Sequence, residues 1–196
     1  RGITSREGAD IFLHPSYERD IHDSYLMKDM EKAVVRIFEA TQANEKIIIY
    51  GDYDCDGIPG SVILHDLLKK IGYENFDVYI PDRHDEGYGL HMEAIKNFIA
   101  DDVKLIITVD LGTSDVTQVA EAQANGIDVI ITDHHLPHEH LPHAYAILNP
   151  KQNGDSYPYD MLCGAGVAFK LATAFAKKYG EFFKIKDGEE KWWLDM

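Results

Sequence analysis

Short continuous runs of hydrophobic residues alternate along this chain with apolar residues at helical spacing. The continuous runs, rich in Ile and Val, are typical of buried strands. They cover residues 46–52, 76–83, 104–112 and 127–135, and a fifth covers 144–150. Helical spacing predicts helices at residues 24–43, 61–71, 90–100, 114–126 and 164–180. Gly72, Gly126 and Gly180 are expected to end three of them.

The alternation of strands and helices predicts the fold class. Its rhythm is typical of an α/β domain, a parallel sheet with helices on both faces. We expect this domain to span residues 46–196, and residues 1–45 to form a helical segment packed on it. Residues 151–160 predict a surface loop, and the charged residues 181–191 are expected to be exposed.

Composition narrows the class further. The chain has 196 residues and is 45% apolar, which suits a domain with a sizeable core. No apolar run approaches the roughly 18 residues that a membrane span needs. The start lacks the apolar stretch of a signal peptide, so none is expected. It also lacks an initiator Met, which indicates a piece of a longer chain. Cys55 and Cys163 are too few for a disulfide framework, so a reducing cytoplasm is expected.

The formal net charge of −15 bears on possible partners. Spread evenly, it would argue against nucleic acid, because Lys and Arg supply nonspecific affinity for phosphates. Carboxylates gathered in one metal site would change that conclusion, because bound cations reverse the local sign.

The stretch "IIIYGDYDCDGIPGS" places Asp52, Asp54 and Asp56 at alternate positions before a glycine. It resembles the start of a calcium-binding EF-hand loop, which needs a bidentate Glu at position twelve. That position is Ile63, and the loop follows a predicted strand rather than a helix. The EF-hand is therefore excluded, and an acidic cluster remains at the carboxyl end of a buried strand, where open α/β sheets bind ligands.

Two further strands end in similar side chains. Asp110 ends one predicted strand, and Asp133, His134 and His135 end another. Helix capping and surface exposure are the ordinary alternatives for an isolated Asp or His pair. Three strand ends that agree favour a metal site, and carboxylates with imidazoles suit Mn²⁺ or Mg²⁺. Two such ions can activate water in phosphoryl transfer.

Two other features are candidates for binding phosphate. Arg83 follows a predicted strand in "IPDRHDEGYGL", although a surface salt bridge is the ordinary alternative. Gly164 and Gly166 lie at a predicted helix start, where free backbone N–H groups could bind an anion. Packing of the helix on the sheet accounts for these glycines equally well.

Cysteine and tryptophan offer weaker candidates. Cys55 is expected to be a small buried residue rather than a nucleophile, because neighbouring carboxylates suppress a thiolate. Trp192 and Trp193 could stack on bases, but packing in the core or at a domain interface is favoured.

Several stretches resemble the successive motifs of the DHH phosphoesterase superfamily. These are "GDYDCDG", "PDRHDEGYG", "VDLG" and "TDHHLP". The opening "FLHPSYERDIHDSYLMKDMEKAVVRIFEA", then "AILNPKQ", "GAGVAFKLA" and the final "LDM", are similar to the RecJ family of single-strand-specific 5′→3′ DNA exonucleases. The resemblance covers nearly the whole chain in order.

The resemblance implies a set of functional residues. The implied metal ligands are Asp54, Asp56, Asp110, His134 and Asp195. Asp52 and His135 match positions close to the metals and complete the implied catalytic set, and Arg83 matches a phosphate-facing Arg. The implied reaction is attack of water, dependent on Mn²⁺ or Mg²⁺, on the 5′-terminal phosphodiester of single-stranded DNA. It releases 5′-mononucleotides in DNA repair and recombination.

The resemblance also implies that further domains, of the DHHA1 and OB-fold types, lie beyond Met196. Single-strand-binding protein and a helicase are the implied protein partners, and no membrane is expected. Two positions depart from the family pattern. Pro59 stands where a Thr or Ser is usual, and Leu111 stands where Asn or Cys is usual. Both departures put efficiency in question more than metal binding.

Two alternative functions remain open. One is a DHH phosphodiesterase for short oligonucleotides or cyclic dinucleotides, which the DHH domain alone separates poorly from the exonuclease. The other is a catalytically dead scaffold. Such relatives lose acidic ligands, whereas this chain keeps them.

Overall fold

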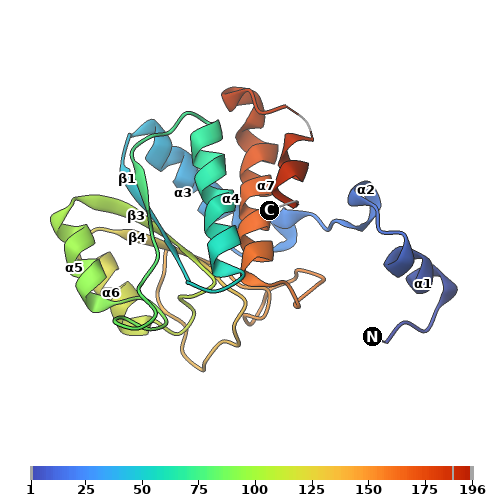
Figure 1. The fold of residues 1–196 in the computed structure, drawn as a ribbon, viewed down its shortest axis with the longest axis horizontal. Coiled ribbons are helices and arrows are strands. Elements are labelled where there is room, and N and C mark those ends of the chain that lie inside the picture. The colour runs from blue at the N-terminus through green and yellow to red at the C-terminus, as the bar shows by residue number, and fades with distance from the viewer. Residues whose placement is uncertain (1, 187, 195–196) are drawn as a thin grey trace.

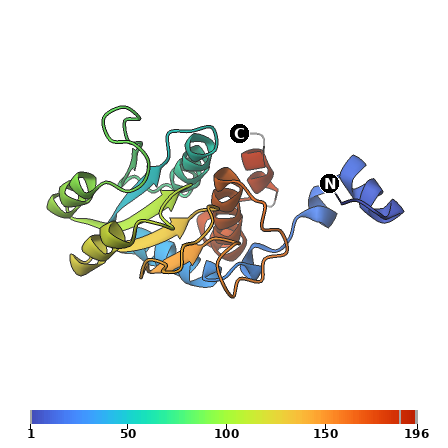
Figure 2. The same cartoon turned by 90° about the horizontal axis from the view of Figure 1, so that it is seen from below.

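A five-stranded parallel sheet forms the centre of the computed structural model, which describes residues 2–186 and 188–194 (Figures 1 and 2). The strand order is β2-β1-β3-β4-β5, and every neighbouring pair is parallel. The strands are β1 (Lys46–Gly51), β2 (Phe76–Tyr79), β3 (Val103–Val109), β4 (Asp128–Thr132) and β5 (Ala146–Leu148). The predicted α/β class is confirmed.

Helices cover both faces of the sheet (Figure 1). On one face pack α3 (Met30–Gln42), α4 (Gly57–Lys70) and α7 (Gly164–Phe183), and on the other pack α5 (Met92–Ala100) and α6 (Val116–Ala124). Successive residues of β1 serve different layers, since Ile47 and Ile49 join the first core whereas Ile48 and Tyr50 join the second. Burial on both faces explains why the strands are continuous apolar runs.

The N-terminal segment is less regular than expected. It contains α1 (Arg6–Leu13), α2 (Tyr17–Asp20) and the short η1 (Ser24–Leu26) before α3. The predicted helix 24–43 is interrupted because Asp29 adopts a left-handed conformation with φ 62°. α1 buries no residue, and Figure 1 shows α1 and α2 extending from the sheet and its helices. Packing of residues 1–45 on the domain stays a prediction for α1, which is exposed here.

Helix α4 begins four residues before the predicted start at Ser61. The reason is the side chain of Asp54, whose effect cannot be predicted from the spacing of apolar residues. Oδ1 of Asp54 accepts hydrogen bonds from the backbone N–H groups of Asp56 (3.0 Å) and Gly57 (2.9 Å). These N–H groups would otherwise lack a partner at the helix start.

Helix α7 continues past the predicted stop at Gly180 to Phe183. The left-handed residue that ends it is Lys184, with φ 59°. Gly180 is buried, and a Cβ at that position would lie 3.6 Å from the Cβ of Ile185. Tertiary packing thus outweighs the weak helix propensity of glycine here.

The C-terminal segment returns to the helices. The 3₁₀ helix η2 (Glu189–Leu194) buries Trp193, whose indole N–H donates to Oδ2 of Asp66 on α4 (2.7 Å). The favoured packing of tryptophan is confirmed for Trp193, while Trp192 is 59% exposed. No helix among residues 2–186 and 188–194 combines the length and apolar character that a bilayer crossing requires.

The register of the sheet aligns the carboxyl ends of four strands. Gly51 pairs with Val109, Val109 with Thr132, and Thr132 with Leu148. The next residues in these strands are Asp52, Asp110, Asp133 and Asn149. They form one row at the edge where ligands bind in doubly wound sheets, around the β1–β3 switch point.

Candidate metal centre

The loop between β1 and α4 carries three of the predicted residues. Asp52 extends β1, donates its N–H to the carbonyl of Val109 (3.0 Å) and is 3% exposed. A Cβ on Gly57 would lie 2.5 Å from the carbonyl oxygen of Asp52, so only glycine fits this tight turn. The turn brings Asp54 and Asp56 to the same edge as Asp52.

The N-terminus of α7 approaches this loop closely. The N–H of Gly164 donates to Oδ2 of Asp56 (2.6 Å), and a Cβ on Gly164 would lie 2.4 Å from the Cβ of Asp110. We expected a free N–H group here for a substrate phosphate, but Gly164 already binds a carboxylate of its own chain. Gly166 lies against Leu162 in the loop before α7, at 3.3 Å from an added Cβ. Its role in phosphate binding stays a prediction.

Asp110 follows β3 in a left-handed conformation, with φ 65°, and is 1% exposed. Asp is among the few residue types that tolerate this region, and such strain is common at functional sites. The next residue, Leu111, is fully buried in the core beneath α5 and α6. Leu111 therefore belongs to this core rather than to the candidate site.

Asp133 fixes the two histidines that follow β4. Its Oδ1 accepts hydrogen bonds from the backbone N–H groups of His134 (2.7 Å) and His135 (3.1 Å) and contacts Nδ1 of His135 (2.8 Å). Its Oδ2 accepts from the N–H of Thr113 (3.0 Å). With both oxygens engaged, Asp133 positions the imidazoles and is not a free ligand.

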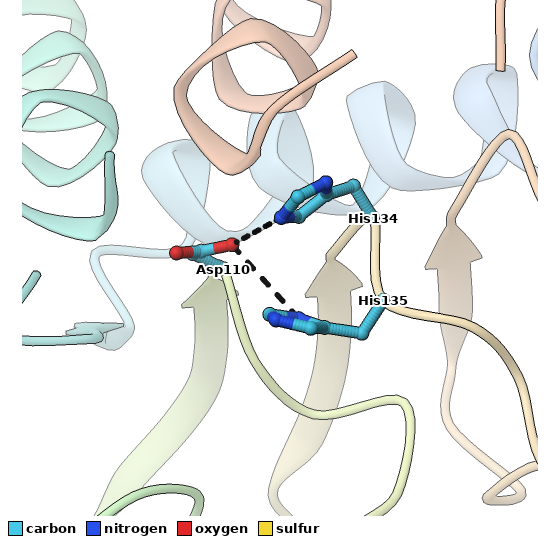
Figure 3. Close-up of side chains that lie close together, drawn as sticks. All are labelled: Asp110, His134 and His135. Atoms are coloured by element: carbon cyan, nitrogen blue, oxygen red, sulfur yellow. Dashed lines mark ion pairs between the residues drawn. The ribbon is translucent and has the colours of Figure 1, made fainter. Parts of the chain in front are cut away.

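The side chains that follow β3 and β4 converge (Figure 3), and Asp56 from the loop after β1 lies close to them. Nε2 of His134 lies 3.2 Å from Oδ1 of Asp110 and 3.9 Å from Oδ2 of Asp56. Nδ1 of His135 lies 4.0 Å from Oδ1 of Asp110. We call the predicted cluster the acidic rim; it consists of Asp52, Asp54, Asp56, Asp110, His134 and His135.

The rim contains three groups of three residues, and within each group the possible ligand atoms lie within 4.8 Å of one another. One group is Asp110, His134 and His135, and a second is Asp52, Asp54 and Asp110. Asp54 and Asp56 form the third together with Cys55. Asp110 is shared by the first two groups, so it lies where two cations could meet.

The carboxylates of the rim differ in the direction of their pKa shift, which depends on burial and on hydrogen bonds. Burial, followed by the neighbouring charges of Asp56 and Asp54, raises the pKa of Asp110 to about 8. Burial also raises the pKa of Asp52. For Asp54, burial acts against ionisation, but the N–H groups of Gly57 and Asp56 outweigh it and lower its pKa.

Burial and hydrogen bonds also shift the pKa values of the two imidazoles and of Asp133 in different directions. Burial lowers the pKa of His134, while the hydrogen bond to Asp133 raises the pKa of His135. Burial opposes ionisation of Asp133 too, yet hydrogen bonds from His135 and Thr113 lower its pKa to about 2. A charged Asp133 thus holds His135 while Asp110 resists ionisation.

The residues present fit a divalent cation. Within residues 2–186 and 188–194, Oδ1 of Asp52 and Oδ1 of Asp110 are buried and accept no hydrogen bond. Buried polar atoms without partners are costly, and each such case needs an explanation. A cation would serve both oxygens and remove the repulsion that raises the pKa of Asp110. Carboxylate and imidazole ligands suit Mn²⁺ or Mg²⁺.

Three residues of the site escaped sequence reasoning. The hydroxyl of Tyr88 donates to the carbonyl of Asp110 (3.1 Å) and lies 3.1 Å from Nδ1 of His135. The Asn149 amide donates to the carbonyl of His135 (2.9 Å), and Nζ of Lys151 donates to the carbonyl of His134 (2.6 Å). The position of Asn149 after a strand end was a usable signal, because it continues the row of Asp52 and Asp110.

The remaining predicted residues lie as follows. Arg83 is exposed, with its guanidinium carbon 4.6 Å from the ring centroid of Tyr53. Cys55 is exposed, so the expectation of a buried residue is wrong; Asp54 and Asp56, on either side of it, fold back onto backbone N–H groups and leave it at the outside of the turn. Asp195 lies outside the described residues.

Fold and site together define a class: an α/β domain with a carboxylate- and histidine-lined centre for divalent cations at the carboxyl edge of its sheet. Residues 46–191 match the N-terminal domain of the DHH family. The match covers well over half of the chain, and the chain belongs to the DHH family.

Similar proteins include RecJ, the single-stranded-DNA-specific exonuclease. The chain is 45% identical to RecJ of Bacillus subtilis over 89% of its length and 22% of the relative's. With RecJ of Escherichia coli the identity is 39% over 76% of the chain and 26% of the relative. A crystal structure of exonuclease RecJ bound to manganese has a TM-score of 0.72 at 34% identity, covering 79% of this chain and 39% of that one. The chain thus spans about a quarter of the length of these curated relatives.

Proposed function

We propose that this chain is the catalytic DHH domain of an exonuclease that degrades single-stranded DNA from its 5′ end and releases 5′-mononucleotides. The carrying observation is that Asp54, Asp110 and His134, from three separate strand ends, meet around buried oxygens that have no hydrogen-bond partner. The printed names of the similar proteins, a single-stranded-DNA-specific exonuclease and an exonuclease bound to manganese, supply the substrate class and the metal.

Asp54, Asp56, Asp110 and His134 are the proposed metal ligands, and Asp195 is a further proposed ligand outside the described residues. When bound, a pair of Mn²⁺ or Mg²⁺ ions would lower the pKa of a water molecule and neutralise charge on the phosphate. The chain's own residues prepare this site. The N-termini of α4 and α7 hold Asp54 and Asp56 in fixed orientations through backbone N–H groups.

His135 is the proposed residue for moving a proton. Nδ1 lies 2.8 Å from the charged Asp133, which places the proton of the neutral ring on Nδ1 and leaves the lone pair of Nε2 free. The hydroxyl of Tyr88 lies 3.1 Å from the same Nδ1 atom and so also contacts this edge of the ring. Asp52 and Asp110 lie buried beside these groups.

Hydrolysis at this site would join the water oxygen to phosphorus and break the bond from phosphorus to the 3′ oxygen of the terminal nucleotide. The 3′ oxygen takes up a proton as it leaves, so the released nucleotide ends in a 3′ hydroxyl. Arg83, on the loop after β2, is the proposed group that binds a phosphate oxygen. The proposed setting is the cytoplasm, with single-strand-binding protein and a helicase as partners in DNA repair.

A manganese titration with labelled single strands tests this function. Mononucleotides released from the 5′ end support the proposal. Cleavage restricted to dinucleotides would instead support a phosphodiesterase for short oligonucleotides, and inertness at every metal concentration would support a scaffold. Strands labelled at the 5′ end and at the 3′ end, assayed in parallel, distinguish the direction of degradation.

A further inference from the structure

Arg83, on the loop after β2, contacts an aromatic ring, although the chain is rich in carboxylates that could pair with it. The chain has 34 Asp and Glu residues against 19 Lys and Arg. Within the described part of the chain, the one contact recorded for Arg83 is its guanidinium carbon over the ring of Tyr53, 4.6 Å from the centroid. Tyr53 belongs to the loop that carries Asp52 and Asp54, so the contact joins the Arg83 loop to the acidic rim.

Of the three carboxylates within three residues of Arg83 in sequence, those of Asp82 and Glu86 are engaged elsewhere. Oδ1 of Asp82 accepts from the backbone N–H groups of His84 (2.8 Å) and Asp85 (3.2 Å). Glu86 accepts from the N–H of Asp82 (2.9 Å) and from the hydroxyl of Tyr79 (2.5 Å). These bonds close the loop into a turn, and they keep both carboxylates from pairing with the guanidinium.

An aromatic partner has a chemical advantage over a carboxylate at this position. A ring attracts a cation through its π face and uses none of the five N–H donors of arginine. A carboxylate would occupy those donors and would compete with a phosphate for them. The charge of Arg83 also reaches the site, because it acts to lower the pKa of Asp52 against the larger effect of burial.

We propose that Tyr53 is a positioning residue that holds Arg83 beside the acidic rim with its hydrogen-bond donors free for a phosphate of the substrate. This inference rests on the proposed function of Arg83 and adds a role for a ring inside the acidic motif. The aromatic ring of Tyr53 makes the contact with Arg83, and the hydroxyl is not needed for it. Tyr53→Phe should therefore keep Arg83 in this position, whereas Tyr53→Leu should not.

The first test observes Arg83 directly and needs no turnover. The Nε–H resonance of Arg83 is followed by NMR in the 196-residue chain, with Mg²⁺ present, while orthophosphate is added. Tyr53→Leu should move this resonance in the phosphate-free chain, because the ring current is lost, and should weaken its response to phosphate about two- to five-fold. Tyr53→Phe should match the unsubstituted chain, and Arg83→Lys should lack the resonance and so confirm its assignment.

The second test is kinetic and uses single strands with a 5′-phosphate or a 5′-hydroxyl. Tyr53→Leu should raise KM about two- to five-fold with little change in kcat, and Tyr53→Phe should reverse that rise. Combined with Arg83→Ala, Tyr53→Leu should add nothing further, because both changes remove the same interaction.

An Arg83 resonance and a KM that are the same in Tyr53→Leu as in the unsubstituted chain would overturn the inference. An Arg83 resonance that ignores phosphate in the unsubstituted chain would also overturn it, while cleavage by that chain would leave the exonuclease proposal intact. The opposite result, a phosphate response that depends on Tyr53 without any cleavage, would support the inference and remove the proposed function.

Discussion

Nε2 of His134 lies 3.2 Å from Oδ1 of Asp110, although the two residues follow different strands and are 24 positions apart in the chain (Figure 3). The register of β3 and β4 produces this contact, because Val109 pairs with Thr132 and the chains leave the sheet side by side. A buried carboxyl whose pKa is raised to about 8 thus faces an imidazole whose pKa is lowered. Both shifts favour the uncharged form of the side chain. His134 can bind a cation in that form, and Asp110 can do so after losing one proton.

Replacing Asp110 tests the proposed centre. Asp110→Asn should reduce release of mononucleotides by more than about 100-fold, because the amide removes a negatively charged ligand shared by two groups of the rim. Asn tolerates the left-handed backbone, so the fold should persist. Asp110→Ala should lose activity equally and cost about 1 kcal/mol more in stability. Turnover retained in Asp110→Asn, measured with labelled strands, would contradict the assignment.

Divalent cations should stabilise the chain against unfolding. A cation that binds only the folded state stabilises it by about 2.7 kcal/mol at a hundred times its Kd. Thermal melts with increasing Mn²⁺ should therefore shift upward for the unsubstituted chain, and the shift should disappear in Asp54→Asn. Asp77→Asn is a matched control, because Asp77 is an exposed carboxylate on β2. An equal shift in both variants would mean that the cation binds elsewhere.

The row of residues that follow the strand ends could be predicted from sequence, but the separate role of each residue in that row could not. Asp110 and Asp133 each follow a buried strand and are 1% exposed. They differ because Thr113 and His135 hydrogen-bond to Asp133, and these partners come from the folded loops rather than from any local pattern. The sequence therefore located the site but could not separate a candidate ligand from a residue that orients one.

A side chain that accepts hydrogen bonds from backbone N–H groups accounts for the error in the predicted start of α4. Asp54 begins α4 early by accepting backbone N–H groups, and Asp56 occupies the N–H of Gly164. Apolar periodicity carries no information on either contact. The exposed Cys55 is a consequence of the same turn.

Gly164 offers a test of the close approach between α7 and β3. Gly164→Ala should favour the helix by propensity, yet its Cβ would lie 2.4 Å from the Cβ of Asp110. We expect a net destabilisation of about 1–3 kcal/mol and loss of the Mn²⁺ response in urea unfolding. Gly166→Ala is the control, because its nearest neighbour is the flexible side chain of Leu162 at 3.3 Å. Equal stability and Mn²⁺ response in the two variants would refute the tight contact.

The packing of η2 on α4 predicts a contrast between adjacent tryptophans. Trp193→Ala should destabilise the fold by about 3–5 kcal/mol, because a large side chain that is 2% exposed leaves a cavity. Trp193→Phe should cost about 1–3 kcal/mol, since Oδ2 of Asp66 loses its donor. Trp192→Ala should stay within about 0.5 kcal/mol, because Trp192 is 59% exposed. Urea unfolding of the three variants measures the contrast, and similar losses at both tryptophans would argue against the buried anchor.

Lys170 on α7 should give the stability of the chain a dependence on alkaline pH. Lys170 is 3% exposed, its ammonium donates to the carbonyl of His22 (2.9 Å), and burial lowers its pKa to about 8 from 10.5. Between these two values the unfolded chain holds more protons than the folded chain, so the contribution of Lys170 to stability rises with pH. Below pH 8 both states are charged, and the penalty for burying the charge is present in full.

Lys170→Met removes that penalty and its pH dependence. The difference in unfolding free energy between Lys170→Met and the unsubstituted chain should therefore shift progressively in favour of the unsubstituted chain from pH 8 to pH 10. Lys177→Met is the control on the same helix, because Lys177 is 61% exposed and pairs with Asp23 at the surface. The measurement is urea unfolding at a series of pH values. A difference that stays constant across this range would show that Lys170 titrates normally in the folded chain, and the expected link between its burial and stability would fail.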